Sequence, residues 1–172
     1  HDQAFGGYEP ILYKVKLYRV ISNIDTYMDA QFDAYREILG IPADSTIGEN
    51  EGLFYENISP VAEDTVHTID YGDSVTINLT ARYVEMDTAY IDSFPGREYF
   101  PINNSGTKVG FVFGQAYFPI TEAIHIAING MKVGETWEVL SSPEYAYGED
   151  GFRHPTRSTI IVPGKMPVHY TI

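Results

Sequence analysis

Hydrophobic and polar residues alternate along residues 74–84, where every second position is apolar: Val75, Ile77, Leu79 and Ala81. Because successive side chains of a β-strand point to opposite faces, this pattern predicts a strand with one buried face. Shorter apolar runs bounded by turn residues predict further strands over residues 52–58, 109–113, 136–140 and 168–172. An alternating run over residues 13–20 also favours a half-buried strand, although a helix fits it as well.

Two segments instead repeat their apolar residues at helical spacing. The first predicts a helix over about residues 25–39, with Asp25 as its N-cap and Gly40 after its end. Its apolar face consists of Ile24, Met28, Phe32, Tyr35, Ile38 and Leu39. The second predicts a short helix that ends at Gly130, with apolar positions at Ile120, Ala123, Ile124, Ala127 and Ile128.

Many antiparallel strands around one short helix indicate an α+β fold. The length of 172 residues fits one domain, or one domain with an extension. We assign residues 1–49 to an N-terminal extension that holds the ambiguous segment, the first helix and a linker rich in turn residues. Residues 50–172 form the main domain.

Composition narrows the classes of function. The net charge of −13 repels polyanions, so nucleic-acid binding is not expected. The chain has no cysteine, which excludes disulfides, thiol catalysis and zinc–thiolate sites. Its 5 histidines lack ligand spacing, and Asp25, Asp29 and Asp33 indicate a solvated helix face, so no metal or cofactor is predicted. Because no run of about 18 apolar residues occurs, no membrane-spanning helix is expected.

The most specific motifs lie near the C-terminus. Residues 131–135 read Met-Lys-Val-Gly-Glu, and residues 144–148 read Glu-Tyr-Ala-Tyr-Gly after the next strand. In this order and spacing they resemble the FKBP-type peptidyl-prolyl cis-trans isomerases. Further segments that resemble the family are residues 72–80, 91–93, 109–114, 120–131, 162–163 and 168–172. The resemblance covers roughly residues 50–172 and implies a bent antiparallel sheet wrapped around one short helix.

The resemblance also implies a site. Its catalytic residues would be Asp92, Tyr147 and Tyr170, and its substrate-binding residues would be Leu79, Ile91, Val109, Ile120, Thr121, Ile124 and Val162. Three positions depart from the family pattern: Leu79 replaces a tyrosine, Ile91 a phenylalanine, and Ile124 the tryptophan of strong isomerases. The implied cup accepts a prolyl ring but has less aromatic surface, so we expect weak turnover.

Prolyl isomerisation rotates an amide bond against a barrier of about 18–20 kcal/mol. An apolar cup lowers this barrier. The planar amide separates more charge than the twisted one, so it loses more hydration free energy when it leaves water. The Tyr147 hydroxyl and the Thr121 backbone N–H are the candidate donors to substrate carbonyls, and Asp92 is a candidate acceptor at the rim. The same residues also fit plainer roles, with Ile124 and Tyr170 as core residues and Asp92 as a turn cap.

Two functions stay open at this level. One is an isomerase that acts on proline-containing polypeptide clients, and the other is a catalytically weak FKBP-like chaperone or peptide-binding module. A structural surface lipoprotein that merely kept the fold is a third reading. A helix and linker ahead of residues 52–56 resemble exported bacterial FKBP-like proteins, many of them lipoproteins. We therefore expect a bacterial envelope protein, either periplasmic or held by a lipid anchor before His1, with an oligomeric state that the sequence does not specify.

Overall fold

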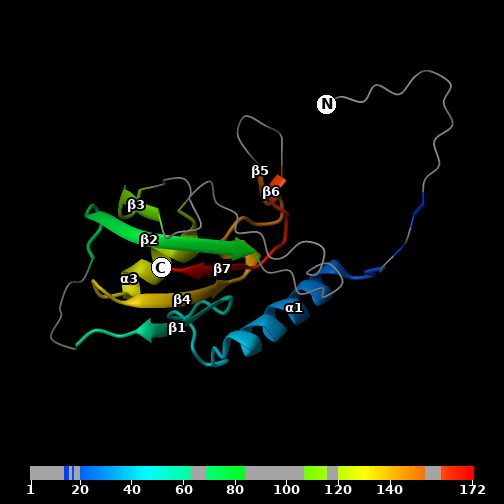
Figure 1. The fold of residues 1–172 in the computed structure, drawn as a ribbon, viewed down its shortest axis with the longest axis horizontal. Helices are drawn as coiled ribbons and strands as arrows, with labels where there is room; N and C mark the ends of the chain where they lie inside the picture. Colours follow the sequence, from blue (N-terminus) through cyan, green and yellow to red (C-terminus); the bar gives the residue numbers. More distant parts are fainter. Residues whose placement is uncertain are drawn as a thin grey trace, which may run out of the picture.

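A five-stranded sheet in the order β1-β4-β7-β2-β3 forms the centre of the molecule (Figure 1). The computed structural model describes residues 14, 15, 17, 20–62, 69–83, 107–115, 120–153 and 160–172. The strands of the sheet are β1 (Leu53–Ser59), β2 (Ser74–Tyr83), β3 (Thr107–Val112), β4 (Thr136–Ser141) and β7 (Val168–Thr171). All of their pairings are antiparallel. The remaining elements are α1 (Ile24–Leu39), α3 (Glu122–Gly130), the 3-10 turn η1 (Pro143–Tyr145) and a ribbon of β5 (Phe152–Arg153) and β6 (Ile160–Val162). The predicted α+β fold is thus confirmed.

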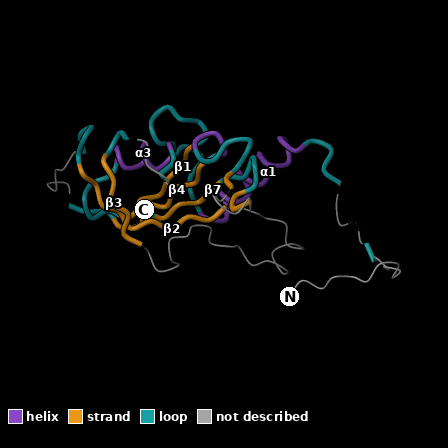
Figure 2. Tube along the Cα trace, turned by 90° about the horizontal axis from the view of Figure 1, so that it is seen from above, coloured by secondary structure: helices purple, strands orange, loops and turns teal. Residues whose placement is uncertain are grey.

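The main core lies between the sheet and α3. The alternation predicted for β2 is present, since Leu79 and Ala81 are buried and Val75 and Ile77 pack against the same cluster. Helix α3 buries the apolar face that its spacing predicted: Ala123, Ile124, Ala127 and Ile128. Figure 2 shows the strands as a curved layer, with α3 near the end that carries β3 and α1 toward the other end.

Helix α1 packs on part of the opposite face of the sheet. Neighbouring side chains of β7 point to opposite faces of the sheet. Tyr170 belongs to the α3 core, whereas the His169 ring lies 5.8 Å from the ring of Tyr35 in α1. A second, smaller cluster joins Ile41 and Leu140 to aromatic and aliphatic side chains of α1 and β1: Phe32, Tyr35, Leu39 and Phe54. The N-terminal helix therefore packs on the part of this face that β1, β4 and β7 form, while Thr76, Asn78 and Arg82 of β2 stay exposed.

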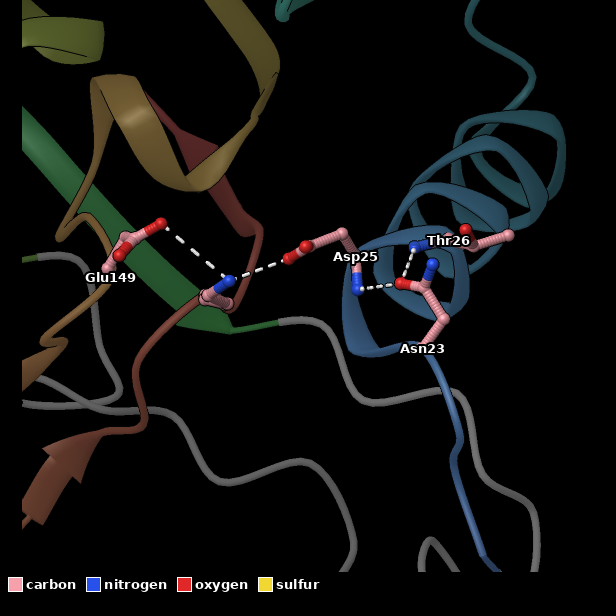
Figure 3. Close-up of polar contacts among 5 residues, drawn as sticks. Asn23, Asp25, Thr26 and Glu149 are labelled. Carbon is pink, nitrogen blue, oxygen red and sulfur yellow. Dashed lines mark hydrogen bonds and ion pairs between the residues drawn. The ribbon is translucent and has the colours of Figure 1, made fainter.

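Asn23, and not Asp25, caps α1, so the predicted cap is wrong. The Asn23 side chain accepts hydrogen bonds from the backbone N–H groups of Asp25 (3.0 Å) and Thr26 (3.2 Å) (Figure 3). Asparagine fills this position well because its side-chain oxygen reaches the unpaired N–H groups of the first turn. The Asp25 carboxylate instead contacts the Lys165 ammonium at 2.6 Å. Gly40 ends the helix as expected, with a φ of 75°.

The segment before α1 and the segment after it both differ from expectation. Val15 and Leu17 are 87% and 78% exposed and belong to no strand, so the half-buried strand is not found at the described positions of residues 13–20. The predicted linker after α1 is partly ordered against β1. Its Ser45 carbonyl accepts from the Tyr55 N–H, and its Ile47 N–H donates to the Leu53 carbonyl, each at 3.0 Å.

Candidate functional site: the Tyr147 loop and the floor beneath it

A short loop after β4 carries Tyr147. Pro143 opens η1, and its carbonyl accepts hydrogen bonds from the N–H groups of Ala146 (3.0 Å) and Gly148 (2.7 Å). Gly148 takes a left-handed conformation with φ 64°, which glycine adopts without strain. Its carbonyl accepts from the Lys165 N–H at 3.0 Å. These bonds tie the loop to the segment after β6 and fix the backbone on both sides of Tyr147.

Two backbone segments approach closely behind this loop. A Cβ atom at Gly164 would collide with the backbone oxygen of Glu149, and one at Gly151 would collide with the backbone of residues 162–164. Only residues without a side chain permit this contact. The close approach keeps the Tyr147 loop against the segment that follows Val162.

Tyr147 itself lies at the edge of the main core. Its hydroxyl is buried, and its ring centre is 5.7 Å from that of Phe152, with the planes tilted by 36°. Burial is the main cause that raises the pKa of Tyr147 above its ordinary value, and the neighbouring Tyr170 raises it further. The phenol is therefore neutral at any physiological pH and keeps its proton for a hydrogen bond.

Tyr170 lies at the centre of the sheet and is fully buried. Its hydroxyl shares a hydrogen bond of 3.0 Å with that of Thr121, the N-cap residue of α3. The Thr121 side chain makes no capping hydrogen bond to its own helix, because its hydroxyl is directed to Tyr170. Burial raises the pKa of Tyr170, while the Thr121 hydrogen bond lowers it by a smaller amount.

The structure brings most of the predicted site residues to one side of the sheet. Leu79, Val109, Ile124 and Tyr170 are buried members of the α3 core, and Ile120 and Tyr147 pack against it. Thr121 joins this group through Tyr170. Val162 is 2% exposed and pairs in register with Phe152, whose ring contacts Tyr147. The other two predicted residues, Ile91 and Asp92, lie outside the described residues.

Three aromatic contacts were missed at the level of the sequence. His125 of α3 lies between Phe111 and Phe113, with ring distances of 5.6 and 5.7 Å. The Phe-Val-Phe alternation of residues 111–113 was a signal for this wall, but nothing in the sequence linked it to His125. Phe152, the neighbour of Tyr147, carried no such signal because its strand, β5, is only two residues long.

Neither of two cavities in the described part of the molecule is lined by Tyr147 or Ile124. One, of about 440 Å³, lies between β2 and the C-terminal end of α3. The other, of about 420 Å³, lies between α1 and the η1 loop. Ile124 is completely buried and Leu79 is 2% exposed, so the expected floor of the cup is formed by closely packed aliphatic side chains. Among the described residues, no group of three His, Asp or Glu side chains is placed to hold a metal ion.

The described helices also bear on membrane association. None of them combines the length and the hydrophobicity that crossing a bilayer requires.

Comparisons with known proteins agree with this arrangement. Residues 66–172 match the family model described as FKBP-type peptidyl-prolyl cis-trans isomerase. The fold is similar to that of the three FKBP domains of wheat FKBP73, with a TM-score of 0.52, 19% identity, and coverage of 73% of this chain and 44% of that one. It is also similar to FkpA from Escherichia coli, with a TM-score of 0.53, 15% identity, and coverage of 85% and 57%. This chain thus spans about half the length of these structures.

A comparison with curated protein sequences gives no significant match. The family match nevertheless covers more than half of the chain and contains α3, the Tyr147 loop and Tyr170. Strand β1 precedes the matched region but pairs with β4 along its length, so it belongs to the same sheet. The chain therefore belongs to the FKBP-type peptidyl-prolyl cis-trans isomerase family.

Proposed function

We propose that the protein accelerates cis–trans isomerisation of Xaa–Pro bonds in polypeptide clients. The observation that carries this proposal is Tyr147, a neutral hydroxyl held by a fixed loop at the edge of an apolar cluster that contains Tyr170 and Ile124. The family of the chain supports the same reaction.

The proposed mechanism involves no covalent step. When a prolyl peptide moves from water onto the apolar surface, its amide loses hydration free energy. The planar amide loses more than the twisted one because it separates more charge, so the barrier between them falls. The Tyr147 hydroxyl donates a hydrogen bond to a carbonyl beside the twisting bond, and the Thr121 N–H is a second candidate donor. One such bond, if formed only in the transition state, contributes about 1–2 kcal/mol, or roughly tenfold in rate.

A second function is favoured by the floor of the site. Ile124 and Leu79 place buried aliphatic side chains at positions where strong isomerases, by resemblance, carry aromatic rings. A site of this kind binds apolar peptide segments but stabilises the twisted transition state of the prolyl amide less. The alternative is therefore a catalytically weak chaperone or peptide-binding module.

Exchange spectroscopy on a short Xaa–Pro peptide with catalytic amounts of protein separates the two functions. We expect acceleration by the native protein, a fall of about tenfold in kcat/KM for Tyr147→Phe, and a change below about twofold for Tyr145→Phe. Tyr145 is the matched control because it lies in the same loop and also packs against the core. Binding without acceleration would establish the module, and equal effects of the two substitutions would remove Tyr147 from the mechanism.

We also propose that the clients lie in a bacterial envelope. The helix and linker ahead of β1 support this, because they resemble the arrangement in exported bacterial members of the family. Fractionation of the source cells tests the proposal: recovery with periplasmic or membrane-anchored proteins supports it, and recovery with cytosolic proteins contradicts it.

A further inference from the structure

A groove lies between α1 and the loop that carries Tyr147. It is the cavity of about 420 Å³ described above, and this volume lies within the range of about 300–1,000 Å³ in which proteins bind ligands. The loop contributes residues 142–144 and 148–149, on both sides of Tyr147 in the chain. The facing wall consists of residues of α1 that recur at helical spacing and so share one face: Asp25, Met28, Asp29 and Phe32.

Part of the lining of the groove is apolar. Phe32 and Pro143 are half-buried, so each ring still exposes part of its surface. Gly52 keeps space open between the walls, because a Cβ atom there would collide with the side chains of Ser142 and Glu144. A ligand that fills the groove therefore gains free energy by covering apolar surface.

The rest of the lining is strongly acidic. Lys165 is the basic residue of the groove, against a set of exposed carboxylates on both sides of it: Asp25, Asp29, Glu51, Glu144 and Glu149. Neighbouring like charges repel one another, and a cation between them relieves the repulsion. The groove therefore favours a positively charged ligand.

Lys165 shows how an ammonium group binds in the groove. Its Nζ lies 2.6 Å from the Asp25 carboxylate on α1 and 3.6 Å from the Glu149 carboxylate on the loop (Figure 3). Its backbone has a φ of 61°, a left-handed conformation that is uncommon for residues other than glycine. The chain itself thus holds one cation between the two walls.

Three carboxylates of the groove are left without such a cation. Asp29, Glu51 and Glu144 form no ion pair with any residue that the structure describes. We propose that they bind a basic segment of a partner polypeptide, one that carries lysine or arginine beside apolar residues. The aliphatic stems of these side chains lie against Phe32 and Pro143, and their charged heads reach the carboxylates. Binding requires no proline, so this site is independent of the prolyl isomerase function proposed above.

Other charged ligands fit the groove less well. Carboxylates line it, but in the described part of the chain no group of them is placed to hold a metal ion. A nucleic acid is repelled by the same charges. A small polyamine offers cationic groups but no apolar side chain for Phe32 and Pro143, so it should bind more weakly than a peptide. A polypeptide segment supplies both kinds of contact.

Fluorescence anisotropy of a labelled peptide tests the proposal with the full chain. The probe is Lys-Leu-Lys-Leu-Lys flanked by glycines, which contains no proline and therefore does not report on isomerisation. We expect saturable binding that weakens at least about threefold when the leucines are replaced by serines, because the apolar walls lose their contacts. Added salt should weaken it further by screening exposed charges. Absence of binding, or equal affinity for the serine peptide or for spermidine, would overturn the proposal.

Substitution of the unpaired carboxylates tests the location. Asp29→Asn, Glu51→Gln and Glu144→Gln should each weaken binding of the leucine peptide about threefold, the effect of one exposed ion pair, and the triple variant at least about tenfold. Glu37→Gln is the matched control, because it removes the same charge from an exposed position of α1 that does not line the groove. If it weakens binding as much as Asp29→Asn, the overall charge of the chain holds the peptide, which contradicts the proposal.

Cross-linking provides a second test of location, and the absence of native cysteine makes it specific. Ser142 lines the groove, whereas Ser74 is exposed on β2 and does not line it. A leucine peptide with a terminal cysteine should form a mixed disulfide with Ser142→Cys chains at least severalfold faster than with Ser74→Cys chains. Excess peptide without cysteine should abolish the difference. Equal rates would contradict the proposal.

One further variant separates a partner from the chain itself. Lys14, Lys16 and Arg19 precede α1 in the sequence and are the basic residues of this chain nearest to it on that side. A full-length variant with glutamine at these three positions should bind the leucine peptide with unchanged affinity. Binding at least about tenfold tighter would show that this chain's own basic segment occupies the groove, and would contradict a partner polypeptide as its ligand.

Discussion

The hydroxyl oxygens of Thr121 and Tyr170 lie 3.0 Å apart, and this hydrogen bond joins the start of α3 to the centre of the sheet. Both residues are at least nine-tenths buried, with exposures of 8% and 0%. The bond satisfies two polar groups that have left water, and it fixes the end of α3 that lies nearest to Ile120 and Ile124.

Removal of either hydroxyl should destabilise the fold. Tyr170→Phe and Thr121→Val should each lower the free energy of unfolding by about 1–2 kcal/mol, because the remaining hydroxyl stays buried without its partner. The double variant should cost less than the sum, with a coupling of about 1 kcal/mol in urea titrations. Tyr71→Phe, at a residue 80% exposed, is the control and should change little. Strict additivity would show that the bond contributes nothing.

His169 should make stability depend on pH. Burial between the sheet and α1, together with Arg82, lowers the pKa of His169 to about 4. The Glu138 carboxylate lies 3.8 Å from Nε2, beyond hydrogen-bonding distance, and does not offset these two effects. In the unfolded chain the pKa is about 6.5, so the unfolded state takes up a proton first.

The contribution of His169 is therefore complete above about pH 6.5 and is lost as the pH falls toward 4, by at most about 3 kcal/mol. His169→Leu should flatten the dependence of unfolding free energy on pH across this window, measured by urea titration at pH 7 and pH 4.5. If the free energy of unfolding of the variant depends on pH as steeply as that of the native protein, titratable groups other than His169 cause the dependence.

Ile124→Trp tests the assignment of the floor. An indole at this position restores the aromatic surface that strong isomerases carry by resemblance, so kcat/KM for an Xaa–Pro peptide should rise severalfold. Ile124 is 0% exposed, and the larger ring should also lower stability by about 1–3 kcal/mol. Ala127→Leu is the control for overpacking, because it enlarges another fully buried side chain of α3. An equal change in activity in both variants would contradict the assignment.

Gly164→Ala should displace the Tyr147 loop. The new methyl group would meet the backbone oxygen of Glu149, which cannot move without shifting the loop. We expect a loss of about 1–3 kcal/mol in stability and a loss of isomerase activity at temperatures where the variant stays folded. Gly110→Ala is the control, since its methyl group would meet its nearest neighbour at 3.8 Å, and it should be neutral or mildly stabilising. Unchanged activity in Gly164→Ala would show that the contact does not position Tyr147.

Local pattern predicted much of the fold. The alternation of β2 and the spacing of α3 require only near neighbours in the chain, and both appear within a few residues of their predicted bounds. The order of motifs around Tyr147 also led to the correct family. The N-cap of α1 was misplaced by two residues, because Asn23 and Asp25 are both good caps and only the backbone geometry selects one.

Distant contacts required the tertiary structure. The sequence placed Thr121 and Tyr170 in one site, but not the bond between their hydroxyls, and it gave no reason to expect His169 beneath Tyr35. The sequence by itself determined which segments become strands and helices, because periodicity is a local property. Only the packed structure decided which polar groups meet in the core and in which order the strands lie in the sheet, because both depend on segments that are far apart in the chain.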